Sequence, residues 1–356
     1  MADNQKMREV FDTSGFVVEH SSNDNIYRVV FPTRKTEDFI AASLARERQA
    51  AAHSVNVFFE PESIAVVGAS RHEGSIGRVI LSNLKRCEFR GPVYPVNPHV
   101  PELEGFQCYP SVGAIGRRVD LAVVAVPQTS VRDVVAECAR AGVRGIVVIT
   151  SGFAEAWSDG RNAQDELCRF ARASGMRMVG PNCMGILCTA PGVSMNATFA
   201  PVWPPSGGVS MLSQSGALGL AMLDHAAQRN IGIASFVSVG NKADVSGNDL
   251  IAYWADDPHT TVIALYLESF GNPRKFARLA PEVAKREPIV ALKSGRSGAG
   301  TRAAASHSAA LASVDAGVDA VLAQAGVIRT NTMEELSTSS RSSRENRCRG
   351  GRVSVW

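Results

Sequence analysis

The chain has 356 residues, of which 45% are hydrophobic and 20% are charged, and its formal net charge at pH 7 is +3. These values are typical of an ordinary globular protein, and the length suggests two domains with appendages. The positive charge is local, because residues 337–352 contain five arginines and a single glutamate while the rest of the chain is close to neutral. Nothing in this balance indicates a nucleic-acid partner or an anionic membrane surface.

The cysteine content and the hydropathy pattern predict the compartment. Seven cysteines form no Cys-x-x-Cys pair, and an odd number in a chain of this size points to a reducing environment. The sequence has no apolar stretch of about 18 residues and no signal peptide. We therefore expect a cytoplasmic protein with no membrane span, and we predict no metal site.

Residues 1–57 do not have the pattern of a complete domain. Two short apolar runs predict a single hairpin that pairs residues 15–20 with residues 25–31. An isolated hairpin is only marginally stable in water. Residues 36–52 are charged and alanine-rich, which predicts a helical linker.

From Ser63 onward, apolar strands alternate with amphipathic helices. In the first unit the predicted elements are strands 64–67, 93–96, 121–126, 145–150 and 178–179, with helices such as 131–141 and 162–174. After a proline-rich joint, a second unit has predicted strands 209–212, 233–239, 262–267 and 289–291. Such alternation predicts two α/β domains, each with a parallel doubly wound sheet. We place their bounds at 58–190 and 191–336, and expect the Ser/Arg-rich residues 337–356 to be disordered.

The first strand of the α/β region ends in Gly68-Ala69-Ser70 and leads into a helix. A helix start at this position offers free backbone N–H groups to a phosphate. An NAD-dependent oxidoreductase also needs an acidic residue after the second strand, to hold the adenosine ribose. That strand ends instead in Asn97-Pro98, so a different nucleotide-bearing cofactor is favoured over NAD.

Three further features of the second unit are candidates for chemistry. Ser213-Gln214-Ser215-Gly216 ends one strand and starts a helix, which suits either phosphate binding or a simple serine N-cap. Glu268 ends strand 262–267, where it lies either in a ligand crevice or in a solvated loop. His307 is surrounded by alanine and serine, but a histidine taken alone is more often a surface or core residue than a catalyst. Together these residues suit a histidine that accepts a phosphoryl group while a carboxylate orients its ring.

Five motifs in order carry a resemblance to a known family. They are Val66-Val67-Gly68-Ala69-Ser70, Pro95-Val96-Asn97-Pro98, Gly180-Pro181-Asn182-Cys183-Met184-Gly185, Ser213-Gln214-Ser215-Gly216-Ala217 and Gly240-Asn241-Lys242-Ala243-Asp244-Val245-Ser246-Gly247. From about residue 58 to residue 336 the chain resembles the NDP-forming acyl-CoA synthetases. This family includes ADP-forming acetate–CoA ligase and is related to the α subunit of succinyl-CoA synthetase. The resemblance implies a Rossmann-like CoA-binding domain followed by a flavodoxin-like, succinyl-CoA-synthetase-type domain.

The resemblance also implies site residues. Those that line the coenzyme A site are Gly68, Ala69, Ser70, Arg71, Ile76, Gly77, Asn97, Pro98, Val126, Pro127, Ser151, Gly152, Phe153 and Asn182. Arg71 and Arg78 lie on the glycine loop and its helix, so we expect them to meet the phosphates of the cofactor or else to be simply exposed. His307 is implied as the phosphorylated histidine, Glu268 as its orienting partner, and residues 213–216 as the phosphate cradle. Ala309 departs from the family pattern, because many relatives have glycine there.

The two ends of the chain refine the expected function. Residues 7–16 and the following strand look like the tail of a GNAT acetyltransferase domain, and the last residues resemble out-of-frame translation. Only 49 residues follow His307, too few for the ATP-grasp domain through which such enzymes use ATP or ADP. We therefore expect the CoA-binding half of an acyl-CoA synthetase, a ligase in a homo- or hetero-oligomer with an ATP-grasp subunit. The alternatives are a non-catalytic CoA-binding protein and a truncated acetyltransferase remnant.

Overall fold

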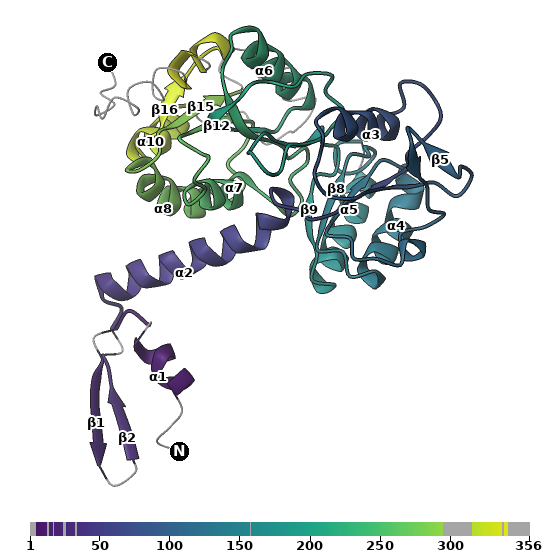
Figure 1. Ribbon diagram of the computed structural model, residues 1–356. Helices are drawn as coiled ribbons and strands as arrows, with labels where there is room; N and C mark the ends of the chain where they lie inside the picture. The colour runs from purple at the N-terminus through teal and green to yellow at the C-terminus, as the bar shows by residue number, and fades with distance from the viewer. Residues whose placement is uncertain are drawn as a thin grey trace.

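Two α/β units lie side by side in the computed structural model, and a long helix leads from them to a small N-terminal hairpin (Figure 1). The structure describes residues 5–340 except for residues 13, 17, 24–25, 33, 157, 295–314 and 337. His307, Ala309 and the tail from residue 341 onward lie outside the described residues. Among the helices that the structure does describe, none combines the length and apolar character needed to span a bilayer.

The first unit is built on a parallel sheet with the strand order β4-β3-β7-β8-β9. These strands are β3 (Ile64–Val67), β4 (Val93–Val96), β7 (Leu121–Val124), β8 (Gly145–Val148) and β9 (Arg177–Val179). Four of the five are buried along most or all of their length, which explains why their sequences are continuous apolar runs. The predicted bounds are confirmed to within two residues at each end.

Helices and short elements complete the first unit. The helices are α3 (Ile76–Arg86), α4 (Gln128–Arg140) and α5 (Ser158–Ala173). A two-residue ladder joins β5 (Glu102–Leu103) to β6 (Phe106–Gln107), and the 3-10 turns are η1 (Asn56–Phe58) and η2 (Gly113–Ile115).

The second unit repeats the same strand order. Its parallel strands are β12 (Ser206–Ser213), β13 (Ile233–Ser238), β14 (Val262–Leu267), β15 (Ile289–Lys293) and β16 (Ile328–Thr330), arranged as β13-β12-β14-β15-β16. The helices are α6 (Gly216–Gln228), α7 (Gly247–Trp254), α8 (Pro273–Ala284) and α10 (Asp315–Gln324). The α/β fold class with parallel sheets in both units is therefore confirmed.

Three strands of the second sheet were not predicted, namely β16 at one edge and two antiparallel strands at the other. β10 (Gly185–Cys188) and β11 (Met195–Thr198) form an antiparallel edge, in which β10 pairs with β13 and β11 pairs with β10. Both are only four residues long and fully buried, so neither shows the polar alternation by which a short strand is recognised. β10 precedes the expected domain boundary at residue 190, yet it pairs within the second sheet.

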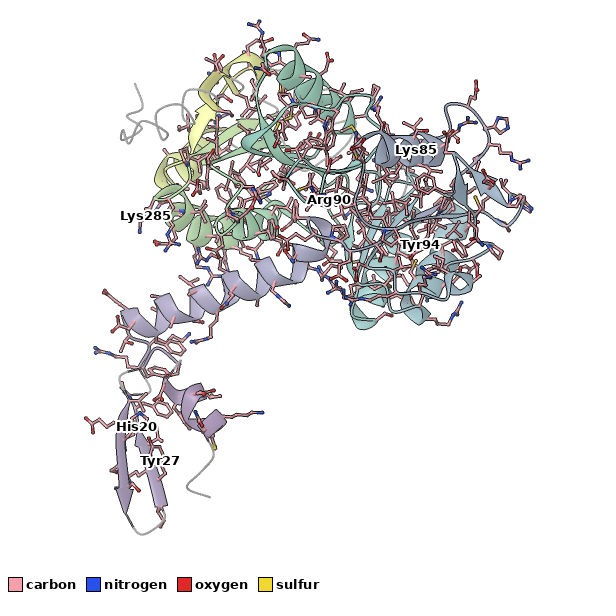
Figure 2. All side chains as sticks on the ribbon, viewed as in Figure 1. His20, Tyr27, Lys85, Arg90, Tyr94 and Lys285 are labelled. Atoms are coloured by element: carbon pink, nitrogen blue, oxygen red, sulfur yellow. The ribbon has the colours of Figure 1, made fainter. Side chains whose placement is uncertain are left out.

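In the N-terminal segment, the first strand of the hairpin begins later in the chain than predicted. It contains α1 (Gln5–Asp12), β1 (Glu19–Asn23), β2 (Ile26–Val30) and α2 (Glu37–Val55). The expected first strand at 15–20 is wrong, because the Phe16 ring stacks on the Phe39 ring of α2 at a centroid distance of 4.1 Å. His20 and Tyr27 lie on the hairpin, away from the α/β units (Figure 2). The helical linker is confirmed, and α2 packs against α7.

The two units are joined by buried polar contacts. The Asn83 side-chain amide on α3 donates to the carbonyl oxygens of Thr198 and Ala200, both at 2.8 Å. Asp244, in the loop after β13, accepts from Arg172 Nε at 2.7 Å and from Arg177 Nε at 2.9 Å. Because these bonds cross from one unit to the other, they fix the loops of both sheets against each other.

Candidate functional site

Both parallel sheets have a topological switch point, where the chain leaves the first strand in opposite directions. In the first sheet this point lies between β3 and β7, and in the second it lies between β12 and β14. Ligands of open α/β sheets bind outside the carboxyl ends of the strands at such points. The predicted residues Gly68–Ser70 and Val126-Pro127 follow the first pair of strands, and Ser213–Gly216 and Glu268 follow the second.

The glycine loop after β3 packs tightly against the neighbouring backbone. Gly68 has a φ of +94°, and a Cβ there would lie 2.3 Å from the carbonyl oxygen of Ala125. A Cβ on Gly77 would lie 2.3 Å from the carbonyl oxygen of Gly68, so the start of α3 packs directly on the loop. Asn97 holds the loop from the second strand by donating from Nδ2 to the Ala69 carbonyl oxygen at 2.6 Å.

The N-terminus of α3 is open to an anion. Ser75 is its N-cap residue but makes no side-chain capping bond, so the N–H groups of the first turn keep their capacity to bind phosphate oxygens. Arg71 is exposed beside this turn. Arg78 differs, because its Nε pairs with Glu104 at 3.0 Å and its Nη1 donates to the Arg71 carbonyl oxygen.

The loop of Ser151, Gly152 and Phe153 after β8 is organised by a carboxylate. Glu155 Oε1 accepts from the backbone N–H groups of Gly152 and Phe153, at 2.5 and 3.2 Å. Burial by itself raises the pKa of Glu155, but the hydrogen bonds from Asn241 and from this loop outweigh it and hold the pKa below its ordinary value. The ionised carboxylate therefore fixes the third predicted CoA-binding loop.

In the second unit, three of the four predicted phosphate residues line a cavity. Ser215 caps α6 by accepting from Leu218 N–H at 3.4 Å, and Gly216 begins the helix. Ser213 is fully buried, and its hydroxyl donates to the Ser215 carbonyl oxygen at 2.7 Å. Ser213 thus shapes the turn from inside, whereas Gln214, Ser215 and Gly216 face the cavity.

Gln214 binds the loop that carries Glu268. Its Oε1 accepts from the N–H groups of Glu268 and Ser269 at 2.8 and 2.9 Å, and its Nε2 donates to the Ser269 carbonyl oxygen at 2.7 Å. All three bonds go to the backbone immediately after β14. The side chain predicted as part of a phosphate cradle therefore also holds the predicted catalytic carboxylate in place.

Lys242 belongs to the motif of residues 240–247 but is not among the predicted site residues. This residue has a φ of +44°, and its Nζ donates to the Ser269 carbonyl oxygen at 2.8 Å and to the Ser269 hydroxyl. Burial lowers its pKa from 10.5 to about 8, with Lys293 adding to that effect and Glu268 opposing it. A lysine four residues after the end of β13 was the signal that could have marked it.

These residues share one cavity of about 530 Å³ between the two units. Glu155 and Gln164 line it from the first unit, and Gln214, Lys242 and Glu268 line it from the second. The structure thus brings Glu155, which holds the 151–153 loop, into the same cavity as Glu268. It says nothing of His307, which is not among the described residues.

The depressed pKa of Lys242 predicts how stability changes with pH. Between pH 8 and pH 10.5 the unfolded chain keeps a proton that folded Lys242 has released, so stability rises with pH in this window. We expect the urea midpoint of the wild type, relative to that of Lys242→Met, to increase from about pH 7 to about pH 9.5. A difference that falls or stays constant would contradict the burial of this ammonium group.

Comparison with known proteins identifies the class of protein that has this fold and this cavity. The family profile of a CoA binding domain matches residues 62–189, and that of a succinyl-CoA ligase like flavodoxin domain matches residues 206–341. An ADP-forming acetate–CoA ligase of Methanocaldococcus jannaschii is 44% identical over 276 residues, which are 78% of this chain and 38% of that protein. The α subunit of ADP-forming acetate–CoA ligase II of Pyrococcus furiosus is 40% identical over 85% of this chain and 65% of its own length.

A solved structure shows the same arrangement. It is a dinucleotide forming acetyl-coenzyme A synthetase 1 of Ca. Korarchaeum cryptofilum in complex with phosphate and ADP, with a TM-score of 0.77 and 43% identity over 81% of this chain and 62% of that one. The two domains define an α/β protein of the CoA-binding, succinyl-CoA-ligase-like type. The chain belongs to the family of ADP-forming acyl-CoA synthetases. It spans less than two thirds of the length of each of these relatives.

Proposed function

We propose that this chain is the CoA-binding half of an ADP-forming acyl-CoA synthetase. The observation that carries the proposal is the single cavity in which the Glu155-held loop of one sheet faces the Glu268 loop of the other. In this proposal residues 58–190 bind coenzyme A and residues 191–336 handle the phosphoryl group. The start of α3 supports the cofactor site, because Ser75 makes no side-chain capping bond and the N–H groups of the first turn are free to bind phosphate.

The proposed chemistry has two balanced steps. An oxygen of inorganic phosphate attacks the carbonyl carbon of acyl-CoA, the carbon–sulfur bond breaks, and CoA leaves as the thiolate. The imidazole of His307 then attacks the phosphorus of the acyl phosphate, and the carboxylate of the acyl group leaves. Glu268 orients the imidazole, and the N-terminus of α6 favours the negative charge of the phosphoryl group.

The nucleotide step needs a further partner in this proposal. We assign the transfer from phosphohistidine to ADP to an ATP-grasp domain carried by a second chain. The P. furiosus relative supports this assignment, since its name describes it as a subunit alpha. A pull-down with the full chain as bait tests it directly, because an ATP-grasp protein should be retained.

The CoA site is tested by calorimetry with a charge placed at the start of α3. We expect the chain to bind CoA more tightly than NADH. Ile76→Glu should weaken CoA binding at least tenfold, because a carboxylate at the first helical position competes with phosphate for the same N–H groups. It should not unfold the helix, since an acidic residue is favourable there.

Ile40→Glu is the matched control for this test. Ile40 lies on α2 and is 46% exposed, against 44% for Ile76. We expect this control to leave CoA affinity unchanged. Tighter binding of NADH than of CoA, or equal CoA affinity in Ile76→Glu and the wild type, would contradict the proposed CoA site.

A further inference from the structure

Asn241 connects the second unit to the CoA-binding loop of the first. Its Nδ2 donates to Glu155 Oε2 and to Gln164 Oε1, the latter at 2.8 Å. Its Oδ1 accepts from Asn182 Nδ2 at 3.3 Å. The other carboxylate oxygen of Glu155 holds the backbone of Gly152 and Phe153. One side chain of the second unit therefore supports the carboxylate on which the 151–153 loop depends.

The next residue along the chain reaches in the other direction. Lys242 Nζ donates to the carbonyl and the hydroxyl oxygens of Ser269. Gln214 holds the same stretch of backbone through the N–H groups of Glu268 and Ser269. Asn241 thus contacts the carboxylate that holds the 151–153 loop, and Lys242 contacts the Glu268 loop, although their Cα atoms are only about 3.8 Å apart.

The backbone between these contacts is held rigidly. Gly240 has a φ of +51°, and a Cβ there would lie 2.2 Å from the carbonyl oxygen of Asn182. Asn241 N–H donates to the Pro181 carbonyl oxygen at 2.9 Å, and Ala243 N–H donates to the Gly180 carbonyl oxygen at 3.1 Å. These contacts fix the backbone of residues 240–243 against residues 180–182, so the Asn241 and Lys242 side chains are held at a constant spacing.

We propose that Asn241 and Lys242 are positioning residues that form an interdomain bridge, through which occupancy of the 151–153 loop by coenzyme A fixes the position of Glu268. The inference rests on the proposed function, because it assumes that coenzyme A contacts this loop. It goes further in assigning a task to two residues between the sites. Through this bridge, coenzyme A bound at the 151–153 loop further steadies the carboxylate that orients His307 in the proposed chemistry.

Amide hydrogen exchange on the full chain, with coenzyme A as the probe, measures this coupling. The N–H groups of Glu268 and Ser269 are direct reporters, because both donate to Gln214 Oε1. In the wild type, saturating CoA should slow exchange of both the 68–78 segment and the 268–269 amides, the latter by about fivefold or more. Lys242→Met should keep the first effect and lose the second, while Lys285→Met should keep both. Lys285 is a fair control, because it lies on the outer surface (Figure 2) and pairs with the exposed Glu282.

Exchanging the amide of Asn241 and the carboxylate of Glu155 tests whether their contact positions the Glu268 loop or only supports the fold. Asn241→Asp places a carboxylate against that of Glu155, so the slowing at 268–269 should be lost and the Kd for CoA should rise about tenfold. Adding Glu155→Gln restores the hydrogen bond with its direction reversed, because the new glutamine amide donates to the new carboxylate at position 241. The side-chain oxygen at position 155 still accepts from the N–H groups of Gly152 and Phe153. The double variant should recover the slowing and a Kd within about twofold of the wild type.

The outcomes distinguish the bridge from the proposed function. Failure of CoA to bind the wild type would remove the proposed function and the bridge with it. CoA binding that slows exchange at 68–78 but leaves 268–269 unchanged would overturn the bridge and leave the proposed function intact. Slowing at 268–269 that persists in Lys242→Met, or a double variant no better than Asn241→Asp alone, would also overturn it. Asn56→Ala, which removes another Asn–Glu hydrogen bond of 3.1 Å, should behave like the wild type.

Discussion

Incorporation of labelled phosphate into this chain, with acetyl-CoA present, is expected to fall about 10- to 100-fold when Glu268 is replaced by glutamine. In the proposed chemistry, this change removes the charge by which Glu268 orients and activates the imidazole of His307. It should leave the loop in place, because Gln214 holds Glu268 and Ser269 through backbone N–H groups that glutamine also has. The loss is therefore expected in the rate of labelling and not in the affinity for CoA.

The same assay separates the catalytic proposal from its alternatives. His307→Ala should abolish the label, and the wild-type label should be lost in mild acid, as expected for phosphohistidine. Glu282→Gln is the control for Glu268→Gln, because Glu282 lies on the exposed face of α8 and pairs with Lys285. Label that survives acid, or that persists in His307→Ala, would refute the phosphohistidine. A wild type that binds CoA but takes up no label would favour the non-catalytic CoA-binding protein.

The central strands could be predicted from the sequence because the pattern that determines them lies within each strand. Runs such as 64–67 and 262–267 are apolar at every position, and a strand covered on both faces needs that pattern. The ends of these strands could also be predicted, because Gly68 and Glu268 break the apolar runs. Parallel topology then places all carboxyl ends at one edge, so the approximate location of both sites follows from the element order.

The remaining features depend on contacts between distant segments. β10 exists because β13 offers it a pairing edge, and nothing within residues 185–188 signals that partner. Phe16 belongs to an apolar run that resembles a strand, but stacking on Phe39 takes it into the loop before β1. The role of Gln214 as the support of Glu268 spans 54 residues of sequence. The local sequence of Ser213–Gly216 cannot distinguish a side chain that binds phosphate from one that supports the loop after the neighbouring strand β14.

The motif around Gly240 shows the same limit at the site. Its letters carry the family resemblance, yet the separate tasks of its residues emerge only in three dimensions. Asn241 bonds to Glu155 across 86 residues, and Lys242 bonds to Ser269 across 27. The positive φ values of Gly240 and Lys242 and the close packing of Gly240 on Asn182 fix the backbone of this motif. Spacing alone could not have predicted that consecutive residues face opposite units.

Replacement of Asp244 by asparagine is expected to lower the free energy of unfolding by about 3 kcal/mol. The Asp244 carboxylate is only 1% exposed and accepts from Arg172, Arg177 and the Met178 N–H. Neutralising it leaves two guanidinium groups without their counter-charge. Because Arg172 is 56% exposed, water compensates in part, so the loss should fall at the lower end of the 3–5 kcal/mol range for broken buried pairs.

Urea unfolding followed by circular dichroism measures this effect, with Glu282→Gln as the control. The control breaks an exposed Glu–Lys pair of 2.7 Å and should cost less than about 1 kcal/mol. Equal midpoints for the two variants would contradict the interdomain role of Asp244. Since Asp244 follows Lys242 by two residues, Asp244→Asn should also weaken CoA-dependent protection of the Glu268 loop. Asp244 anchors the segment to the first unit, so loosening that anchor should disturb the bridge even though both bridge side chains remain.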